Sequence, residues 1–294
     1  MSVIDIKGIT KDYGNHKGVF KVSFQVEQGE VVGFLGPNGA GKTTTIRQLM
    51  GFIKPDQGSV TILGMDCFHQ SAQIQKQLGY LPGEIAFMDD MTGIEFIHFI
   101  ADMKGIKDFS RAQELIDFLE LDARGKIKKM SKGMKQKIGI VIAFMQNPDI
   151  FILDEPTSGL DPLMQNKFVE LIRQAKAQGK TILMSSHMFE EVEHTCDRVV
   201  IIKDGEIIAS DTIERLLSTK RKTYEITFHN VLDAQSFMKQ HEDSTIMEQK
   251  IIMSLQGSVD SLLKELAGYT IDEINVKTPT LEELFMHYYG GDKA

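Results

Sequence analysis

Gly36-Pro37-Asn38-Gly39-Ala40-Gly41-Lys42-Thr43 is the stretch that decides the fold, because it fits the pattern G-x-x-x-x-G-K-[ST]. The apolar run Val31–Leu35 precedes it and the helix-like run Thr44–Phe52 follows it, which is the strand–loop–helix setting that the pattern requires. Glycines let such a loop turn tightly, so that several backbone N–H groups point at one anion. The stretch therefore predicts a loop that cradles phosphate groups.

The side chains of this loop have separate expected tasks. Lys42 would neutralise charge on the β- and γ-phosphates of a nucleotide, and Thr43 would place its hydroxyl on Mg²⁺. The helix that follows would add the positive end of its dipole. The residues expected to hold the nucleotide here are Gly36, Asn38, Gly39, Gly41, Lys42, Thr43 and Thr44.

Strand-length apolar runs alternate with helix-length segments through most of the 294 residues. The strand-like runs are Val31–Leu35, Ser59–Leu63, Ile150–Leu153, Thr181–Met184 and Arg198–Ile202, and the helix-like ones are Thr44–Phe52, Pro162–Ala177 and Phe189–Thr195. This alternation predicts an α/β fold with a largely parallel sheet that is covered on both faces. Polar and apolar residues alternate in Ser2–Ile9 and Val19–Glu27, which predicts an antiparallel β subdomain with one wet face.

Two regions depart from this alternation. Residues from about 92 to 145 lack strand-like runs and predict a helical insertion. After the cluster Lys220-Arg221-Lys222, strand-like and helix-like runs alternate on a shorter scale. Together with the phosphate loop, this organisation predicts a nucleotide-binding domain over residues 1–219, with a helical subdomain at about 92–145. A small α+β accessory domain would occupy residues 220–294.

Composition narrows the class of protein. The chain has 33 Lys+Arg against 41 Asp+Glu, a net charge of −8, which argues against binding nucleic acid over its whole surface. Its two cysteines cannot form a disulfide framework or a four-thiolate zinc site, so we expect a reducing cytoplasm. Asp5 and Lys7 interrupt the stretch where a signal peptide needs apolar residues, and no run of 18 apolar residues occurs. Any membrane connection is therefore expected to come through a partner.

Further polar residues follow two of the apolar runs. Asp154 and Glu155 end the run that starts at Phe151, and the carboxyl end of a parallel strand faces the ligand crevice. Asp154 would orient the Mg²⁺ shell, and Glu155 would accept a proton from the attacking water, although an exposed Asp-Glu-Pro turn is the plain alternative. His187 follows Thr181–Met184, which moves it toward the γ-phosphate. Its alternative role is a structural hydrogen bond.

Six elements together resemble the ATP-binding subunits of ABC transporters, over about residues 2–217. In chain order they are Tyr13, the loop 36–43, Met130-Ser131-Lys132-Gly133-Met134-Lys135-Gln136, Ile152-Leu153-Asp154-Glu155, Ser158-Gly159-Leu160-Asp161 and His187. The resemblance implies a P-loop NTPase core that binds ATP and Mg²⁺. It also implies that Tyr13 stacks on adenine, that Glu155 is the catalytic carboxylate and that His187 contacts the γ-phosphate. The plain alternative for Tyr13 is a tyrosine at the edge of a sheet.

The same resemblance implies partners. Ser131 and Gly133 would complete the ATP site of an opposite protomer, and the loop that ends at Asp161 would communicate across this dimer. Ser131 also precedes a helix-like run, so it would present a hydroxyl and free N–H groups at a helix N-terminus, which is an anion site. A second ATP-binding subunit, identical or not, and a transmembrane permease are therefore expected. The chain would lie in the cytoplasm on the inner face of the membrane.

The sequence departs from the family pattern in two places. Lys132 and Met134 replace a glycine and a glutamine of the signature segment, although Ser131 and Gly133, the two positions that approach phosphate, are retained. Gly83 and Glu84 stand where the family usually has a glutamine that touches Mg²⁺ and the attacking water. Glu84 would substitute for it with a shift of one residue.

Two surface features leave alternatives open. Seven basic residues lie between Arg124 and Lys137, either as a solvated face or as a patch for nucleic acid or lipid headgroups, and no aromatic residues stand among them to stack bases. The segment Thr278–Phe285 resembles the end of exporter-type members. Leu281, Leu284, Phe285 and Tyr288 would share one face of a helix that docks on the ATPase core or on a partner.

The leading hypothesis is thus an ATPase subunit that drives a separate membrane protein, with export as the direction. An alternative is a soluble ABC ATPase that acts on ribosomes or nucleic acid. Such relatives carry two ATPase units or a long coiled coil, whereas this chain has one phosphate loop and no such heptad run. A small-molecule kinase would leave the signature segment unexplained.

Overall fold

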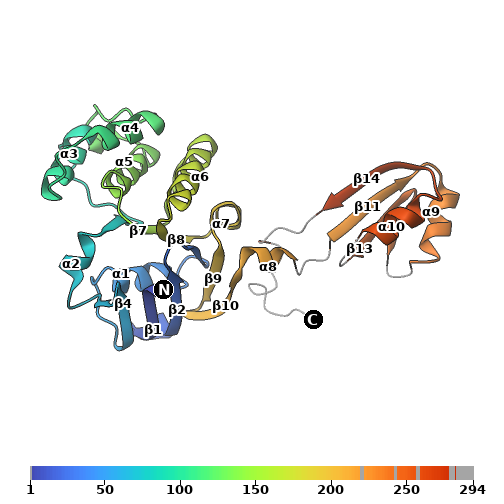
Figure 1. The fold of residues 1–294 in the computed structure, drawn as a ribbon, viewed down its shortest axis with the longest axis horizontal. Helices are drawn as coiled ribbons and strands as arrows, with labels where there is room; N and C mark the ends of the chain where they lie inside the picture. Colours follow the sequence, from blue (N-terminus) through green and yellow to red (C-terminus); the bar gives the residue numbers. More distant parts are fainter. Residues whose placement is uncertain (1, 219–221, 242–243, 256–258, 278–281, 283–294) are drawn as a thin grey trace. The chain divides into compact units, whose positions relative to one another are not determined.

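The strand that leads into the phosphate loop, β3 (Val31–Leu35), lies inside a six-stranded sheet in the computed structural model (Figure 1). The other strands are β6 (Leu78–Leu81), β7 (Ile150–Asp154), β8 (Thr181–Ser186), β9 (Arg198–Lys203) and β10 (Glu206–Thr212). Their order is β10-β9-β3-β8-β7-β6, and all neighbours are parallel except β10, which is antiparallel to β9. Every residue of β3, β7 and β8 is buried, as expected for strands that are covered on both faces. The predicted α/β core is confirmed.

The structure describes residues 2–218, 222–241, 244–255, 259–277 and 282. The chain divides into two units, Met1–Ile213 and Glu214–Ala294. The sequence predicts the boundary between the two domains at residue 219, within the short stretch 219–221 that the structure does not describe. The residues Leu281, Leu284, Phe285 and Tyr288, for which we predict a docking helix, also lie outside the described residues.

The N-terminal segment forms a separate antiparallel sheet, of order β2-β1-β4-β5. Its strands are β1 (Ser2–Asp12), β2 (Gly18–Glu27), β4 (Gln57–Ile62) and β5 (Met65–Asp66). From Phe24 to Glu27 buried and exposed residues alternate strictly, as predicted for a strand with one buried face and one solvent-exposed face. The apolar run predicted at Ser59–Leu63 belongs here as β4, paired with β1, and not to the parallel sheet.

Helix α1 (Lys42–Leu49) packs between the two sheets of this unit. Its Ile46 and Leu49 are fully buried in one apolar cluster with residues of β1, β3 and β7. The helix starts at Lys42, two residues before the start predicted at Thr44, and Gly41 precedes it with φ 111°. A Cβ atom on Gly41 would lie 2.5 Å from Cγ1 of Val19, so both the backbone conformation and the space require glycine.

Residues 92–145 are helical, as predicted for the insertion. They form α3 (Gly93–Met103), α4 (Ser110–Phe118), a 3₁₀ turn (Ile127–Lys129) and α5 (Lys132–Phe144). Thr92 and Glu95 close a capping box at the start of α3, and Ser131 caps α5 by accepting a hydrogen bond from Met134 N at 3.2 Å. Figure 1 shows α3, α4 and α5 gathered together, with α6 (Pro162–Ala177) beside them.

Helix α7 (Phe189–Thr195) covers part of the parallel sheet. Its Val192 is fully buried, and a Cβ atom on Gly33 of β3 would lie 2.5 Å from Val192 Cγ1. The glycine therefore lets the helix approach the strand closely. The remaining helix of this region is the short α2 (Ser71–Gln75).

The C-terminal unit contains a four-stranded antiparallel sheet of order β12-β13-β11-β14. After α8 (Ile213–Ser218), the elements are β11 (Lys222–Phe228), α9 (Val231–Met238), β12 (Thr245–Met247), β13 (Lys250–Leu255), α10 (Asp260–Leu266) and β14 (Ile271–Lys277). This is the β-α-β-β-α-β arrangement, which sequence patterning alone misses because β12 has three residues. Ile226, Phe228, Phe237 and Leu262 form its apolar core. Among the described residues of the whole chain, no helix is both long and apolar enough to cross a bilayer.

Candidate functional site

The phosphate loop wraps around its own lysine. Lys42 is 5% exposed, and its Nζ donates to the carbonyl oxygens of Gly36 at 2.5 Å and Pro37 at 3.2 Å. Nζ also lies 3.1 Å from Oε1 of Glu155. A buried ammonium needs such oxygen partners, and phosphate oxygens are equivalent acceptors. Lys42 is thus held where an anion in the loop would meet it.

Asp154 lies at the carboxyl end of β7 beside two hydroxyl groups. It is 1% exposed, and Ser185 Oγ donates to its Oδ1 at 2.5 Å. Burial raises the pKa of Asp154, and hydrogen bonds from the Ser185 and Thr43 hydroxyls partly offset this rise. A buried carboxylate beside a threonine hydroxyl is the set of hard oxygen donors that suits Mg²⁺. Among the described residues, no group of three or more His, Cys, Asp or Glu is arranged so that it could hold a metal ion.

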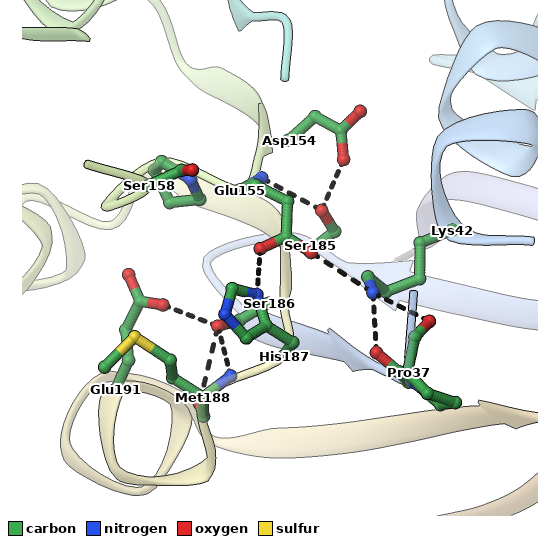
Figure 2. A network of polar contacts seen from close by, with 12 residues as sticks. Pro37, Lys42, Asp154, Glu155, Ser158, Ser185, Ser186, His187, Met188 and Glu191 are labelled. Atoms are coloured by element: carbon green, nitrogen blue, oxygen red, sulfur yellow. Dashed lines mark hydrogen bonds and ion pairs between the residues drawn. The ribbon is translucent and has the colours of Figure 1, made fainter. Parts of the chain in front are cut away.

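Glu155 joins the two neighbouring strand ends (Figure 2). Its Oε2 lies 2.5 Å from Nδ1 of His187, which follows β8, while its Oε1 faces Lys42, which follows β3. The backbone of Glu155 has φ +50°, a conformation that non-glycine residues rarely adopt and that concentrates at functional sites. The predicted catalytic residues Lys42, Glu155 and His187 are therefore brought together.

Two residues that hold Glu155 in place received no role from the sequence. Gln136 of α5 donates to the carbonyl oxygens of Glu155 at 3.3 Å and Pro156 at 2.8 Å. Ser185 accepts from the backbone N of Glu155 at 3.0 Å through its hydroxyl while it donates to Asp154. Ser185 could have been found as the residue at the carboxyl end of the strand next to Asp154. Gln136 carries no such signal, because its partner is 20 residues away in the chain.

The signature residues lie against a different loop. A Cβ atom on Gly133 would lie 2.6 Å from the carbonyl oxygen of Gly159, and Lys132 Nζ donates to Ser158 Oγ at 2.8 Å. The side chain of Asp161 caps α6 by accepting from Met164 N at 3.0 Å. Ser131 likewise caps its own helix. Within one chain these residues contact each other's segments, and among the described residues no hydrogen bond or ion pair joins Ser131, Gly133 or Asp161 to the phosphate loop.

The other predicted residues border the loop or lie exposed. Tyr13 is 55% exposed in the turn between β1 and β2, and its backbone N donates to Lys17 at 2.8 Å. Asn38, Gly39 and Thr43 are exposed and Thr44 is half-buried, so the open rim of the loop is polar. A Cβ atom on Gly83 would lie 3.2 Å from Asp154 Oδ2, which places the segment after β6 at the site. Glu84 is exposed there.

Part of the basic cluster is paired with acids. Lys128 Nζ lies 2.8 Å from Asp90 Oδ1, and Arg124 Nε lies 3.1 Å from Asp122 Oδ1. These exposed pairs agree with a solvated face, where ion pairs contribute little to stability.

The geometry suits transfer of a phosphoryl group, because a glycine loop, a lysine, a buried carboxylate and a carboxylate–histidine pair meet at one sheet edge. A family model described as ABC transporter matches residues 19–158. The linearmycin resistance ATP-binding protein LnrL of Bacillus subtilis is 34% identical over 306 residues, and the match covers 98% of each chain. The chain belongs to the family of ABC transporter ATP-binding proteins. It is an ATPase of the ABC type.

Two further similarities agree with this family. The bacitracin transport ATP-binding protein BcrA of Bacillus licheniformis is 34% identical over 301 residues, covering 99% of this chain and 98% of BcrA. The solved dimeric structure of a bacterial ABC transporter cassette is 25% identical with a TM-score of 0.65, covering 71% of this chain and 98% of that one. ABC ATP-binding proteins dimerise and work with transmembrane partners. The predicted family, fold class and ATPase activity are confirmed.

Proposed function

We propose that this ABC ATP-binding protein hydrolyses Mg²⁺-bound ATP within a dimer and thereby drives an exporter. The observation that carries the proposal is the position of Glu155 between Lys42 and His187, on three strand ends that adjoin one another in the sheet. A carboxylate in this position accepts a proton from a water that attacks the γ-phosphate. Its neighbours Lys42 and His187 face the negative charge that develops on the phosphoryl oxygens.

The residues of the loop have the following proposed tasks. Phosphate oxygens replace the carbonyls of Gly36 and Pro37 and the carboxylate of Glu155 as partners of Lys42. Glu155, released from Lys42, is then free to accept a proton from water. The γ-phosphate becomes the second partner of His187. The backbone N–H groups of the loop, including those of Asn38, Gly39, Gly41 and Thr44, hold the β-phosphate.

Thr43 and Asp154 are the proposed Mg²⁺ residues. The Thr43 hydroxyl acts on the carboxyl of Asp154 by lowering its pKa, so the oxygen donors that the ion needs are near one another. Bound there, Mg²⁺ would neutralise charge on the β- and γ-phosphates. Gly83 leaves room beside Asp154, and the exposed carboxylate of Glu84 is the proposed replacement for the usual glutamine of this segment.

A second protomer is proposed to complete each site. Ser131 and Gly133, at the N-terminus of α5, would contact the γ-phosphate bound to the opposite protomer, because a helix N-terminus is an anion site. Asp161 and its loop would lie at the dimer interface, and Tyr13 would stack on adenine. The support is the exposed position of Tyr13 and Ser131 and the dimeric solved cassette.

Export is the proposed direction, and the inner face of the cell membrane the proposed location. The support is that two relatives matched over almost their whole length carry the words linearmycin resistance and bacitracin transport in their names. A transmembrane permease is the proposed partner. Isolation of the full chain from detergent-solubilised membranes, followed by mass spectrometry, should recover a polytopic protein in a fixed ratio.

The sharpest test of the site is Glu155→Gln. This change removes the proton acceptor and keeps the size of the side chain, so hydrolysis should fall by roughly 10²- to 10⁴-fold while ATP still binds. A dimer that contains ATP should then persist on gel filtration, whereas the wild-type dimer dissociates as ATP is hydrolysed.

Glu190→Gln is the matched control, because Glu190 is an exposed glutamate four residues after the end of β8. Its hydrolysis should equal that of the wild type. If Glu155→Gln hydrolyses ATP at the rate of the control, Glu155 is not the proton acceptor and the proposed function of the site is wrong.

A further inference from the structure

A second carboxylate beside the site is buried and incompletely paired. Glu191 of α7 is 5% exposed, and its Oε1 makes no hydrogen bond within the described part of the chain. Its Oε2 accepts a hydrogen bond from Ser186 Oγ at 2.7 Å. Burial raises the pKa of Glu191 to about 7, against the opposite influence of the Ser186 and Thr157 hydroxyls. A buried carboxyl with an unpaired oxygen is costly, and such groups concentrate at functional sites.

The hydroxyl that Glu191 holds fixes the turn around His187. Ser186 precedes the histidine, and its Oγ accepts a hydrogen bond from the backbone N of Met188, which follows the histidine, at 2.9 Å. One hydroxyl thus accepts from Met188 and donates to Glu191 (Figure 2). The bond from Met188 closes the turn that spans His187, and the bond to Glu191 ties that turn to α7. The imidazole itself points the other way, onto Glu155.

This hydroxyl has a competing arrangement. The carbonyl oxygen of Met188 lies 3.4 Å from Ser186 Oγ and is a second possible acceptor for its proton. Oε2 of Glu191 is closer, at 2.7 Å, and hydrogen bonds to a carboxyl at such a distance are the stronger ones. Glu191 therefore decides which way the Ser186 proton points, and leaves the hydroxyl lone pairs for Met188 N.

Glu191 also borders the loop that follows Glu155. A cavity of about 320 Å³ is lined by residues that include Thr157, Pro162, Met188 and Glu191. Thr157 is buried, lies two residues after Glu155, and accepts at its carbonyl from Leu160 N at 3.0 Å. The carboxyl of Glu191 is thus placed between the segment that carries His187 and the segment that carries Glu155.

We propose that Glu191 is a positioning residue for ATP hydrolysis: through the Ser186 hydroxyl it sets the turn that aims His187 at Glu155 and the γ-phosphate. Glu191 has no contact with the phosphate loop among the described residues, so it acts through Ser186 and not on the nucleotide. The inference rests on the proposed roles of His187 and Glu155. It assigns to the buried carboxyl a task that the site itself does not include.

The test is a set of full-length variants measured for kcat and for nucleotide affinity. Glu191→Ala removes the acceptor and should lower kcat for ATP hydrolysis roughly tenfold to a hundredfold, the size expected when a reacting group is misplaced by about 1 Å. The Kd for a fluorescent ATP analogue should stay unchanged. Glu191→Gln keeps an acceptor oxygen and should restore most of kcat. Glu190→Ala, the exposed neighbour on the same helix, should match the wild type.

A double-mutant cycle separates positioning from general destabilisation. Ser186→Ala should lower kcat to the same extent as Glu191→Ala, and the double variant should be no slower than either single one. Additive losses, or a loss of ATP affinity equal to the loss of kcat, would overturn the proposal. Circular dichroism at the assay temperature checks that each variant is folded, and the Gln variant keeps the test decisive if Ala is not.

Failure of this proposal is distinct from failure of the proposed function. If Glu155→Gln abolishes hydrolysis while Glu191→Ala and Ser186→Ala turn over ATP like the wild type, only the role of Glu191 is wrong. If Glu155→Gln remains active, the site assignment on which Glu191 depends is wrong.

Discussion

Two glutamates, one in each unit, each contact two nitrogen-bearing side chains but lie in different structural settings. Glu155 has Lys42 Nζ at 3.1 Å and His187 Nδ1 at 2.5 Å. Glu225 has Lys250 Nζ at 2.6 Å and Lys277 Nζ at 2.5 Å. Each carboxylate thus bridges two nitrogen-bearing side chains, and neither carboxylate side chain is more than 20% exposed.

The settings differ in the backbone that supplies the partners. Glu225 is in the middle of β11, and its partners come from β13 and β14, the two strands paired with it. Glu155 follows β7 with a positive φ, and its partners come from the loops after β3 and β8. A ladder of hydrogen bonds keeps the Glu225 partners in register, whereas loop residues can exchange partners. Similar contacts therefore agree with a structural role for Glu225 and with the reactive role that we propose for Glu155.

The largest expected difference is in the rate of ATP hydrolysis, when one lysine partner of each glutamate is replaced by alanine. Lys42→Ala should lower ATP hydrolysis by roughly 100- to 1000-fold, because a buried cation that faces the transferred phosphoryl group is lost. Lys250→Ala should leave hydrolysis unchanged, because its carboxylate partner keeps Lys277 and lies in the other unit. Phosphate release at saturating ATP measures both.

The affinity for nucleotides gives a second comparison between Lys42→Ala and Lys250→Ala. Lys42→Ala should also weaken binding of ATP more than binding of ADP, since its Nζ faces the position of the β- and γ-phosphates. A Lys250→Ala protein that lost hydrolysis would instead show that the two units depend on each other in catalysis, and the contrast between the two glutamates would then be misplaced.

The sequence alone predicts the site residues that are contiguous in the chain or that stand at the ends of apolar runs. The loop 36–43 is contiguous, and Asp154, Glu155 and His187 each follow an apolar run, so strand ends in a parallel sheet bring them together. The boundaries were wrong where helix starts depend on tertiary space: α1 begins at Lys42 because Gly41 fits against Val19, which no local pattern shows. The apolar run Ser59–Leu63 pairs with β1 as β4 and not with the parallel sheet, because strand pairing depends on contacts that the local pattern does not show.

Two residues near the site, Gln136 and Glu191, could not be predicted from the sequence for one physical reason. Both contact segments that are distant in the chain or on another element, through hydrogen bonds that follow no sequence periodicity. The roles of Ser131, Gly133 and Asp161 remain predictions, because in one chain their side chains or segments serve as helix caps and loop contacts. Such roles depend on a second chain, which a single sequence specifies only through resemblance.

The next expected effect is on how the free energy of unfolding changes with pH. The titrations of Glu191 and Glu225 should change it in opposite directions as the pH rises. The pKa of Glu191 is raised from 4.5 to about 7, so the folded chain holds this proton more tightly than the unfolded chain. Its contribution to stability is greatest below pH 4.5 and is lost as the pH rises through about 7. Roughly 2 kcal/mol of this change should fall between pH 5.5 and 8.5.

Urea unfolding of the wild type and of Glu191→Gln measures this difference. The variant cannot ionise, so its free energy of unfolding relative to the wild type should rise by about 2 kcal/mol from pH 5.5 to 8.5. Glu225→Gln is the control, because hydrogen bonds from Lys250 and then Lys277 lower the pKa of Glu225. Its contribution is lost only as the pH falls below 4.5, so its difference from the wild type should be constant over this window. A constant difference for Glu191→Gln would mean that Glu191 is ionised throughout.

The smallest expected effect is that of Glu225→Gln on its own unit. The amide keeps the shape of the side chain but loses the charge attraction to Lys250 and Lys277, so the pairing of β11 with β13 and β14 should weaken slightly. Hydrogen exchange should become faster at the amides of β11, and should not change in the loop 36–43. The effect should shrink in 1 M NaCl, where screening acts within about 3 Å. Faster exchange in the phosphate loop would show instead that the ladder around Glu225 supports the ATP site, and the two glutamates would then belong to one coupled system.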